Sequence, residues 1–269
     1  WLALFGKIQT ELANLTPSQT TFYAKIDLAE TLVKLSPNEV NNAAKILANA
    51  AKEAKTLGNP RGESYALGRL GGLYEQTQQW DAAKNLTQQG LIIAQQIRAA
   101  EIAYLWQWQT GRLLKVTGEQ SRAILSYADA VNTLQSLRQD LAAINQDVQF
   151  SFRESVEPVY RELVDLLLQN NPSQTQLQQA RLTLEALQLA ELANFFREAC
   201  LDVQPQQIDQ IDPTAAVIYP IILSDRIEVI LSLPGQPLRN FTTKLEKPQI
   251  ETAINRMRQS MRRTAFAQE

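Results

Sequence analysis

The chain has 269 residues, 45% of them hydrophobic and 7% aromatic, which is typical of a protein that buries a large core without disulfide bonds. With 26 basic and 28 acidic residues, it lacks the excess positive charge that drives nucleic-acid binding, so we expect no nucleic-acid partner. It has no histidine and a single cysteine, which excludes Ser-His-Asp and Cys-His catalysis within these residues. We therefore expect no catalytic residue, no cofactor and no metal site in this chain.

The longest apolar runs, such as residues 215–223, are much shorter than the roughly 20 residues that span a bilayer, so we expect no membrane partner. The single cysteine, Cys200, cannot form an intramolecular disulfide, which favours a cytoplasmic location. Acidic neighbours should keep its thiol unreactive. The chain begins at Trp1 and not at an initiator methionine, which indicates a piece of a longer protein whose targeting signal is not visible.

Apolar residues recur at three- and four-residue steps along most of the first 200 residues, and this period predicts amphipathic helices joined by short loops. Three helix starts place a capping side chain before proline, namely Thr16-Pro17, Ser36-Pro37 and Asn171-Pro172. The predicted helices span residues 2–14, 18–35, 37–57, 61–77, 80–98, 101–116, 119–138, 153–169 and 174–199.

The pattern changes after Cys200. Residues 201–213 are polar with two prolines and read as a linker, and two β-branched runs follow at 215–223 and 227–233. A short polar turn separates the two runs, so they predict a β-hairpin. Pro220 removes a backbone donor, which places its strand at a sheet edge or at a bulge. A basic amphipathic helix is predicted at 248–263.

A small-residue signature recurs 40 positions apart, with Gly71 and Ala83 in one helical hairpin and Gly111 and Ala123 in the next. A period of this size indicates stacked hairpins. The first hairpin resembles the tetratricopeptide repeat through Leu67, Leu70, Gly71, Tyr74, Trp80, Ala83, Thr87 and Gly90. The following repeat keeps Gly111, Leu114, Gly118, Ala123, Tyr127 and Ala130, and a degenerate earlier one has Leu28, Ala29, Leu32, Ala43, Leu47 and Ala50.

Residues 184–201 and 215–233 resemble the junction of bacterial proteins that join such repeats to a caspase-like CHAT domain. In that family the catalytic His and Cys follow the hairpin, and no position of this chain matches either of them. The resemblance implies three parts: a repeat domain at 1–200, a linker at 201–213 and the truncated N-terminal part of a CHAT-like domain at 214–269. The expected fold class is mainly α, a tetratricopeptide-like superhelix of antiparallel helical hairpins with a small C-terminal α+β segment.

In tetratricopeptide stacks the first helix of each hairpin lines the concave face, where a peptide would lie. Trp106 and Trp108 are two positions apart, so they cannot both face the core. We hypothesise that Trp106 packs between helices while Trp108, with two cations, anchors a peptide carrying acidic and apolar side chains. The candidate partner-binding residues are Tyr65, Gly72, Glu75, Gln76, Trp108, Arg112 and Lys115.

Four interpretations stay open at this point. The leading one is a scaffold that binds a protein or peptide partner, as the recognition arm of its parent. The second is that the parent is a cysteine endopeptidase whose catalytic residues lie downstream. The third is a structural role in which the exposed hairpin edge pairs with a second chain. A fourth concerns the site alone, where Trp108 packs against neighbouring helices and the cations form a solvated face.

Overall fold

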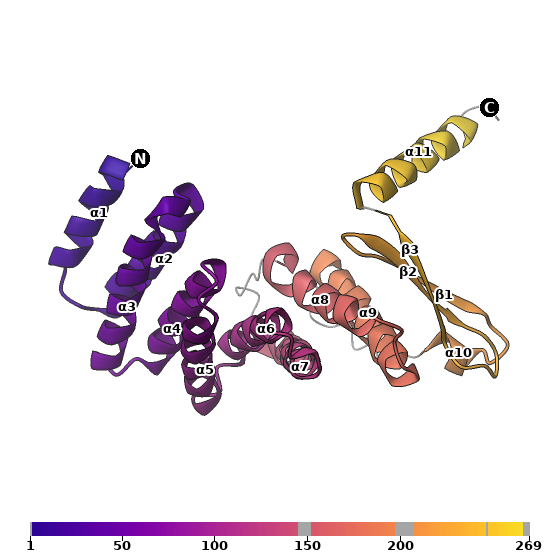
Figure 1. Cartoon of the computed structure of the whole chain (residues 1–269), viewed down its shortest axis with the longest axis horizontal. Coiled ribbons are helices and arrows are strands. Elements are labelled where there is room, and N and C mark those ends of the chain that lie inside the picture. Colours follow the sequence, from indigo (N-terminus) through magenta and orange to yellow (C-terminus); the bar gives the residue numbers. More distant parts are fainter. Residues whose placement is uncertain (1, 145–151, 197–206, 246, 266–269) are drawn as a thin grey trace. The chain divides into compact units, whose positions relative to one another are not determined.

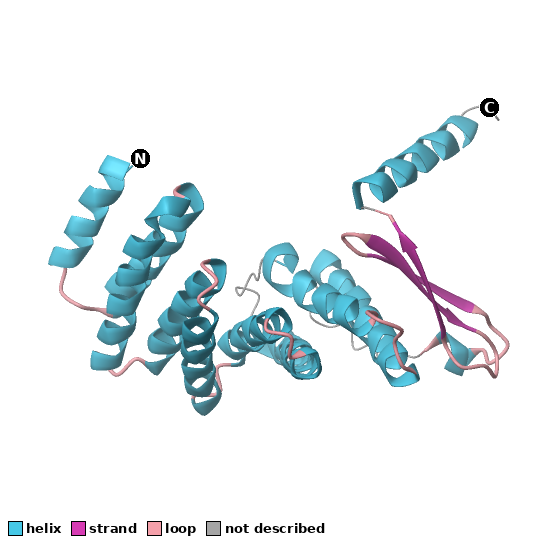
Figure 2. Cartoon of the chain, viewed as in Figure 1, coloured by secondary structure: helices cyan, strands magenta, loops and turns pink. Residues whose placement is uncertain are grey.

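The computed structural model describes residues 2–144, 152–196, 207–245 and 247–265 (Figure 1). The chain divides into two compact units, Trp1–Val148 and Gln149–Glu269, which we describe separately. The expected fold class is confirmed, because stacked helices dominate and the described strands are confined to residues 217–244 (Figure 2). Cys200 lies outside the described residues.

The first unit is a stack of helices in which each packs against the next. Its hairpins are α2–α3, α4–α5 and α6–α7, and the first helices of successive hairpins also touch, α2 against α4 and α4 against α6. The elements are α1 (Leu2–Asn14), α2 (Gln19–Leu35), a 3-10 turn (Pro37–Glu39), α3 (Val40–Thr56), α4 (Pro60–Gln76), α5 (Trp80–Gln96), α6 (Ala100–Val116) and α7 (Gln120–Ile144).

Four loops of this unit repeat one backbone design every 20 residues. The middle residue of each loop has a positive φ, at Gly58, Gln78, Arg98 and Gly118. The next backbone N–H then donates at 2.9 Å to a carbonyl in the last turn of the preceding helix, as from Asn59 to Ala54. This is the Schellman motif, which satisfies carbonyls at the helix end and turns the chain back. The same loop follows each of the 17-residue helices α4, α5 and α6.

The small residues of the repeat lie where two helices approach closely. A Cβ added to Gly71 would lie 2.6 Å from the hydroxyl of Thr87, and one added to Gly111 would lie 2.7 Å from the ring of Tyr127. Ala83 and Ala123 are fully buried. The predicted small-residue signature therefore marks the contact within each hairpin.

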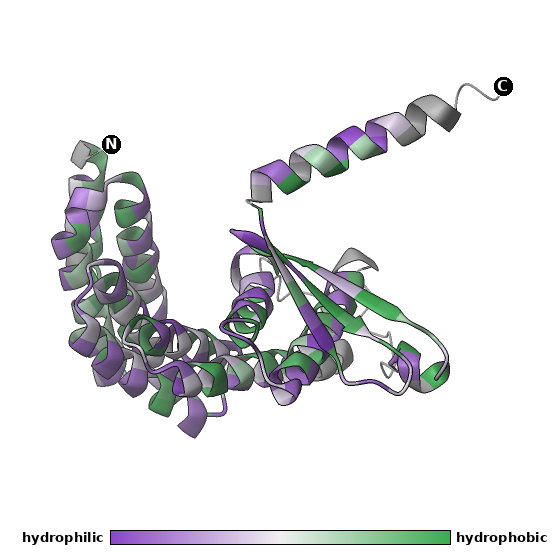
Figure 3. Cartoon of the chain, turned by 45° about the vertical axis from the view of Figure 1, so that its right-hand side comes forward, coloured by the Kyte–Doolittle hydropathy of each residue, from purple (hydrophilic) through white to green (hydrophobic). Residues whose placement is uncertain are grey.

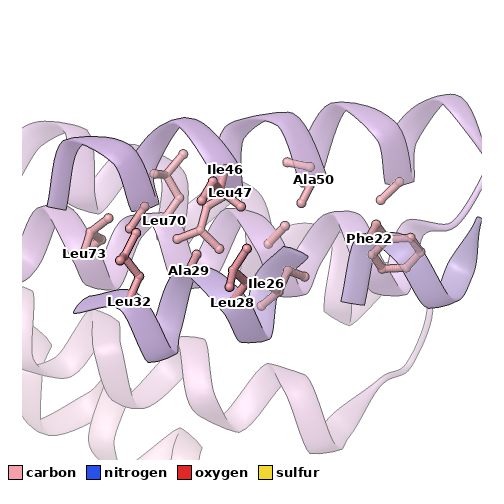
Figure 4. Close-up of a cluster of buried hydrophobic side chains, with 14 residues drawn as sticks. Phe22, Ile26, Leu28, Ala29, Leu32, Ile46, Leu47, Ala50, Leu70 and Leu73 are labelled. Carbon is pink, nitrogen blue, oxygen red and sulfur yellow. The ribbon is translucent and has the colours of Figure 1, made fainter. Parts of the chain in front are cut away.

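A cluster of buried hydrophobic side chains lies between α2, α3 and α4 (Figure 4). It includes Phe22 and Ile26, which are fully buried, and all six apolar residues expected for the degenerate repeat. Burying an aliphatic or aromatic side chain of this size stabilises the fold by about 1.5–3 kcal/mol. These contacts make α2–α3 a full member of the stack.

Two of the predicted helix caps differ from those in the structure, although α9 (Gln174–Phe196) begins at Gln174 as predicted. Helix α2 begins at Gln19 with Ser18 as its cap, and Ser18 exchanges hydrogen bonds with Thr21 in a capping box. Ser173 forms the same arrangement with Gln176. The predicted caps Thr16 and Asn171 are therefore wrong by two positions, because the serine after each proline is the residue that reaches the third helical position.

Two further predicted helices start late and one ends late. The segment from Pro37 opens as a 3-10 turn, and the α-helix begins only at Val40. A π-helical turn at Phe152–Val156 precedes α8 (Glu157–Leu167), so the helix predicted from 153 starts at 157. Helix α7, predicted to end at 138, continues to Ile144.

The second unit combines a helical hairpin with a three-stranded antiparallel sheet. Strand β1, which contains Pro220, is an edge strand, as predicted. Strand β3 was not predicted from the sequence. The remaining elements are α9 (Gln174–Phe196), α10 (Ile208–Ile211), β1 (Val217–Ile222), β2 (Arg226–Ser232), β3 (Arg239–Lys244) and α11 (Lys247–Ala265).

Helices α8 and α9 cover one face of the sheet. Arg226 of β2 donates at 2.8 Å to Asp165 of α8 and at 2.6 Å to the buried Glu228. The Tyr219 hydroxyl donates to Glu185 of α9 at 3.0 Å. These bonds join the sheet to the α8–α9 hairpin in one compact unit. The division of the structure into compact units does not test where domains begin and end in the sequence. The domain limits at 200 and 214 therefore stay predictions.

The candidate protein-interaction face

The first helices α2, α4 and α6 lie next to one another and carry the candidate residues. We call the surface formed by Glu30, Tyr65, Arg69, Glu75, Trp108 and Arg112 the first-helix face. All of these side chains except Glu30 and Arg69 were singled out from the sequence, and all are partly exposed. Their arrangement determines what this face can bind.

Three of the predicted residues form one cluster. The guanidinium of Arg112 in α6 donates from Nε and Nη2 to the two carboxylate oxygens of Glu75 in α4, at 2.7 and 2.8 Å. The same guanidinium lies over the ring of Trp108, 4.5 Å from the ring centre. A bidentate pair fixes the plane of the guanidinium, and the cation–π contact in turn fixes the indole. The sequence did not predict that these three side chains touch.

A second cluster lies between α2 and α4. Arg69 Nε is 2.7 Å from a carboxylate oxygen of Glu30, and the Arg69 guanidinium lies 4.8 Å from the ring centre of Tyr65. Burial disfavours the charge on Arg69, but Tyr65 and Glu30 outweigh it and raise the pKa of Arg69. Arg69 and Glu30 were missed by sequence reasoning, because their spacing of 39 positions follows no local helical rule.

A third ion pair, between Arg61 of α4 and Glu101 of α6, also joins neighbouring first helices. In each of these three pairs, an arginine of one first helix contacts a glutamate of a neighbouring first helix. Positive charge on this part of the face is therefore balanced locally. The aromatic rings of Tyr65 and Trp108, held by arginine, are its partly exposed apolar features.

The two neighbouring tryptophans separate as expected. Trp106 is 2% exposed, and its indole N–H donates at 3.1 Å to Ser64, whose hydroxyl donates to the Gly90 carbonyl at 2.7 Å. Trp108 is half-buried on the other side of α6. The hypothesis that Trp106 packs between helices is confirmed, while the role of Trp108 in binding stays a prediction.

Buried Gln109 supports the face from below. Its amide donates to the Gly68 carbonyl at 2.9 Å and to the Thr87 hydroxyl at 2.6 Å, so one side chain joins α4, α5 and α6. Gly72 lies directly beneath it, because a Cβ there would be 2.9 Å from the Gln109 carbonyl oxygen. Gly72 is therefore a packing position. The sequence signal for Gln109 was a polar residue three positions after Trp106, on the side of the predicted helix that faces the core.

The other two candidate residues, Gln76 and Lys115, are exposed at the C-terminal ends of α4 and α6. Across residues 2–144, 152–196, 207–245 and 247–265, no group of three or more Cys, Asp or Glu side chains is placed to hold a metal ion. In the same ranges no helix has the length and apolar character needed to cross a membrane.

No protein-family model and no curated protein matches the chain. Solved structures that are similar to it include the following two. A putative kinesin light chain of Podospora anserina with nearly identical TPR-like repeats is 17% identical, with 68% of this chain and 100% of that chain covered and a TM-score of 0.39. BtubC (BKLC) from P. vanneervenii is 14% identical, with 70% and 92% covered and a TM-score of 0.28.

Proposed function

We propose that this chain is a protein-interaction scaffold that binds a peptide segment of its partner on the first-helix face. The observation that carries the proposal is the cluster in which Arg112 is held by Glu75 and covers Trp108. A large aromatic side chain fixed in one position costs little entropy when it is buried by a partner. Residues of the Trp, Tyr and Arg types dominate the binding energy of protein interfaces.

The charge balance of the face refines the expected partner. Because Arg112, Arg69 and Arg61 each already face a glutamate, an acidic peptide must compete with a carboxylate already in place. An apolar or aromatic side chain can instead contact the rings of Trp108 and Tyr65 without breaking an ion pair. We infer a peptide whose anchors are apolar, with acidic side chains contributing at the polar rim.

A selection experiment tests the proposal. A random-peptide display library is panned on the immobilised full chain, and the affinity of the selected peptide is measured by fluorescence anisotropy. The double variant Trp108→Ala/Arg112→Ala should weaken binding by about tenfold or more, as expected for hot-spot residues. The matched control is Leu125→Ala/Arg122→Ala, which removes an exposed apolar residue and an exposed arginine from α7. Equal affinity in both double variants, or a selection without binders, would contradict the proposal.

A second function concerns the parent protein and rests on the resemblance to proteins with a CHAT domain. The resemblance expects a hairpin at residues 215–233, and β1 and β2 form an antiparallel hairpin there. We propose on this basis that the parent is a caspase-like cysteine endopeptidase of the cytoplasm, with this chain as its regulatory arm. The test is to express the longer reading frame and assay peptide cleavage before and after changing its candidate cysteine to alanine. Cleavage unaffected by that change, or no downstream His and Cys, overturns this reading.

A further inference from the structure

The sheet of the second unit has one apolar face that α8 and α9 do not cover. Side chains alternate along each strand, so Val217, Tyr219 and Ile221 of β1 point toward the helices while the residues between them point away. Ile218 is 64% exposed and Phe241 of β3 is 52% exposed. We define the outer sheet face as Ile218, Pro220, Ile222, Ile227, Val229, Leu231 and Phe241.

Helix α11, which follows β3 directly, carries a matching apolar stripe. Ile250, Ala253, Ile254 and Met257 recur at three- and four-residue steps, and the exposed Arg256 and Arg258 flank this stripe. Hydrophobic and hydrophilic positions alternate along α11 (Figure 3). Ile250 is 7% exposed and Met257 is 62% exposed, so the stripe is buried at its start and open farther along. Helices in proteins gain most of their stability by packing an amphipathic face against a partner.

We propose that α11 docks through this stripe on the outer sheet face of its own chain, which makes the second unit a sheet covered by helices on both sides. The connection is the first argument. Only residues 245 and 246 separate β3 from α11, so a tethered helix competes with any separate molecule at a high effective concentration.

Available space and dimensions are the second argument. Gln174 of α9 bonds both the N–H and the carbonyl of Leu238, at 3.0 and 2.8 Å, immediately before β3. This helical layer occupies the inner face, so the outer face is the side of the sheet that is left for α11 to pack on. The 19 residues of α11 extend about 28 Å, enough to span the roughly 23 Å of the 7-residue strand β2.

Hydrogen exchange on the full chain provides the first test. Docking predicts protected backbone amides along residues 250–260, although these residues lie near the end of the described chain. Ile254→Asp should accelerate their exchange by about tenfold or more, since it places a charge in the stripe. Gln259→Asp adds the same charge on the opposite side of α11 and should leave exchange unchanged. Fast exchange in the unaltered chain, or equal effects of the two variants, would overturn the proposal.

Chemical cross-linking separates docking within one chain from docking between two. In a Cys200→Ser background, Val229→Cys/Ile254→Cys treated with a short bis-maleimide should give a cross-linked monomer. Val229→Cys/Gln259→Cys should give far less. Cross-linked dimers in place of the monomer would assign the outer sheet face to a second copy of the chain. Equal cross-linking at positions 254 and 259 would show that α11 has no single orientation on the sheet. Both results refute the proposal.

Discussion

Both carboxylate oxygens of Glu75 accept hydrogen bonds from Arg112, which lies one hairpin farther along the chain, at 2.7 and 2.8 Å. This pair joins α4 to α6 across the first-helix face and positions the guanidinium over Trp108. The geometry ties the first-helix face to the packing of the repeat, because the same contact orients the indole and connects two hairpins. The strength of this pair can be measured.

A double-mutant cycle of Glu75→Gln and Arg112→Gln should give a coupling energy of about 1 kcal/mol. This value is at the upper end of the range for partly exposed ion pairs, because the contact is bidentate. The coupling should decrease as salt is added. Urea unfolding followed by tryptophan fluorescence measures it in the first unit alone, since all four tryptophans lie before residue 149. The single-contact pair Lys84–Glu119 is the control and should couple more weakly. No coupling at low salt would contradict the structure.

Gly68→Ala should destabilise the first unit. The added Cβ would lie 2.2 Å from the ring of Trp106, so the buried indole has to move, at a cost of about 1–3 kcal/mol. Gly6→Ala is the control, because nothing lies within 4 Å of its Cβ position, and it should leave stability unchanged or raise it by up to roughly 1 kcal/mol. Thermal unfolding by tryptophan fluorescence distinguishes the two variants. A Gly68→Ala protein as stable as Gly6→Ala would show that α4 and α6 are not in this contact.

The second unit should lose stability at alkaline pH through Tyr219. Burial, together with the hydrogen bond to Glu185, raises the pKa of Tyr219 to about 12 from the ordinary 10.0. Between pH 10 and about pH 12 the unfolded chain has released the phenolic proton while the folded chain retains it. The free energy of unfolding therefore falls as the pH rises through this range. Absorbance titration of tyrosinate should show a late-titrating group near pH 12 that disappears in Tyr219→Phe. An unchanged titration curve would contradict the contact with Glu185.

Asp209→Asn should destabilise the second unit by about 1–3 kcal/mol, because it removes the charged partner of a buried arginine. Arg181 is 8% exposed and donates to Asp209 at 2.6 Å. Burial opposes the charge of Asp209, but the hydrogen bonds from Arg181 and Ser232 outweigh it and lower the pKa of this carboxyl below 3.8. The contribution is therefore present above pH 3.8 and is lost as the pH falls through the lowered pKa.

Circular dichroism melts at neutral and acidic pH check this difference, which should shrink in acid. Asp225→Asn serves as the control, since the side chain of Asp225 is 69% exposed. A neutral-pH effect no larger than that of the control would mean that Arg181 is satisfied without Asp209.

The sequence predicted the helical hairpins because small residues and apolar periods are local signals that survive without knowledge of the fold. It also separated Trp106 from Trp108, since helix geometry alone places them on different sides. The positive φ at Gln78 and Arg98 was not visible, because neither residue favours that conformation and the repeated loop imposes it. Strand β3 was missed because its residues are mostly polar and exposed, so no alternation marks it.

The contacts of the first-helix face were beyond sequence reasoning. Glu75 and Arg112 are 37 positions apart, and Glu30 and Arg69 are 39 apart, so their pairing depends on the exact offset between hairpins. That offset follows from loop geometry and helix length together. The sequence predicted which helices form the face. The pairing of charges on that face could be seen only in the structure.

Site-specific photo-cross-linking tests the binding face most directly. A benzophenone amino acid replaces either Gln76, on first helix α4, or Gln89, on second helix α5, and both positions are exposed glutamines in the unaltered chain. The full chain is irradiated with the selected peptide, and cross-linked peptide is quantified by mass spectrometry. The account predicts capture at position 76 and background at position 89. Capture at position 89, with none at position 76, would contradict it.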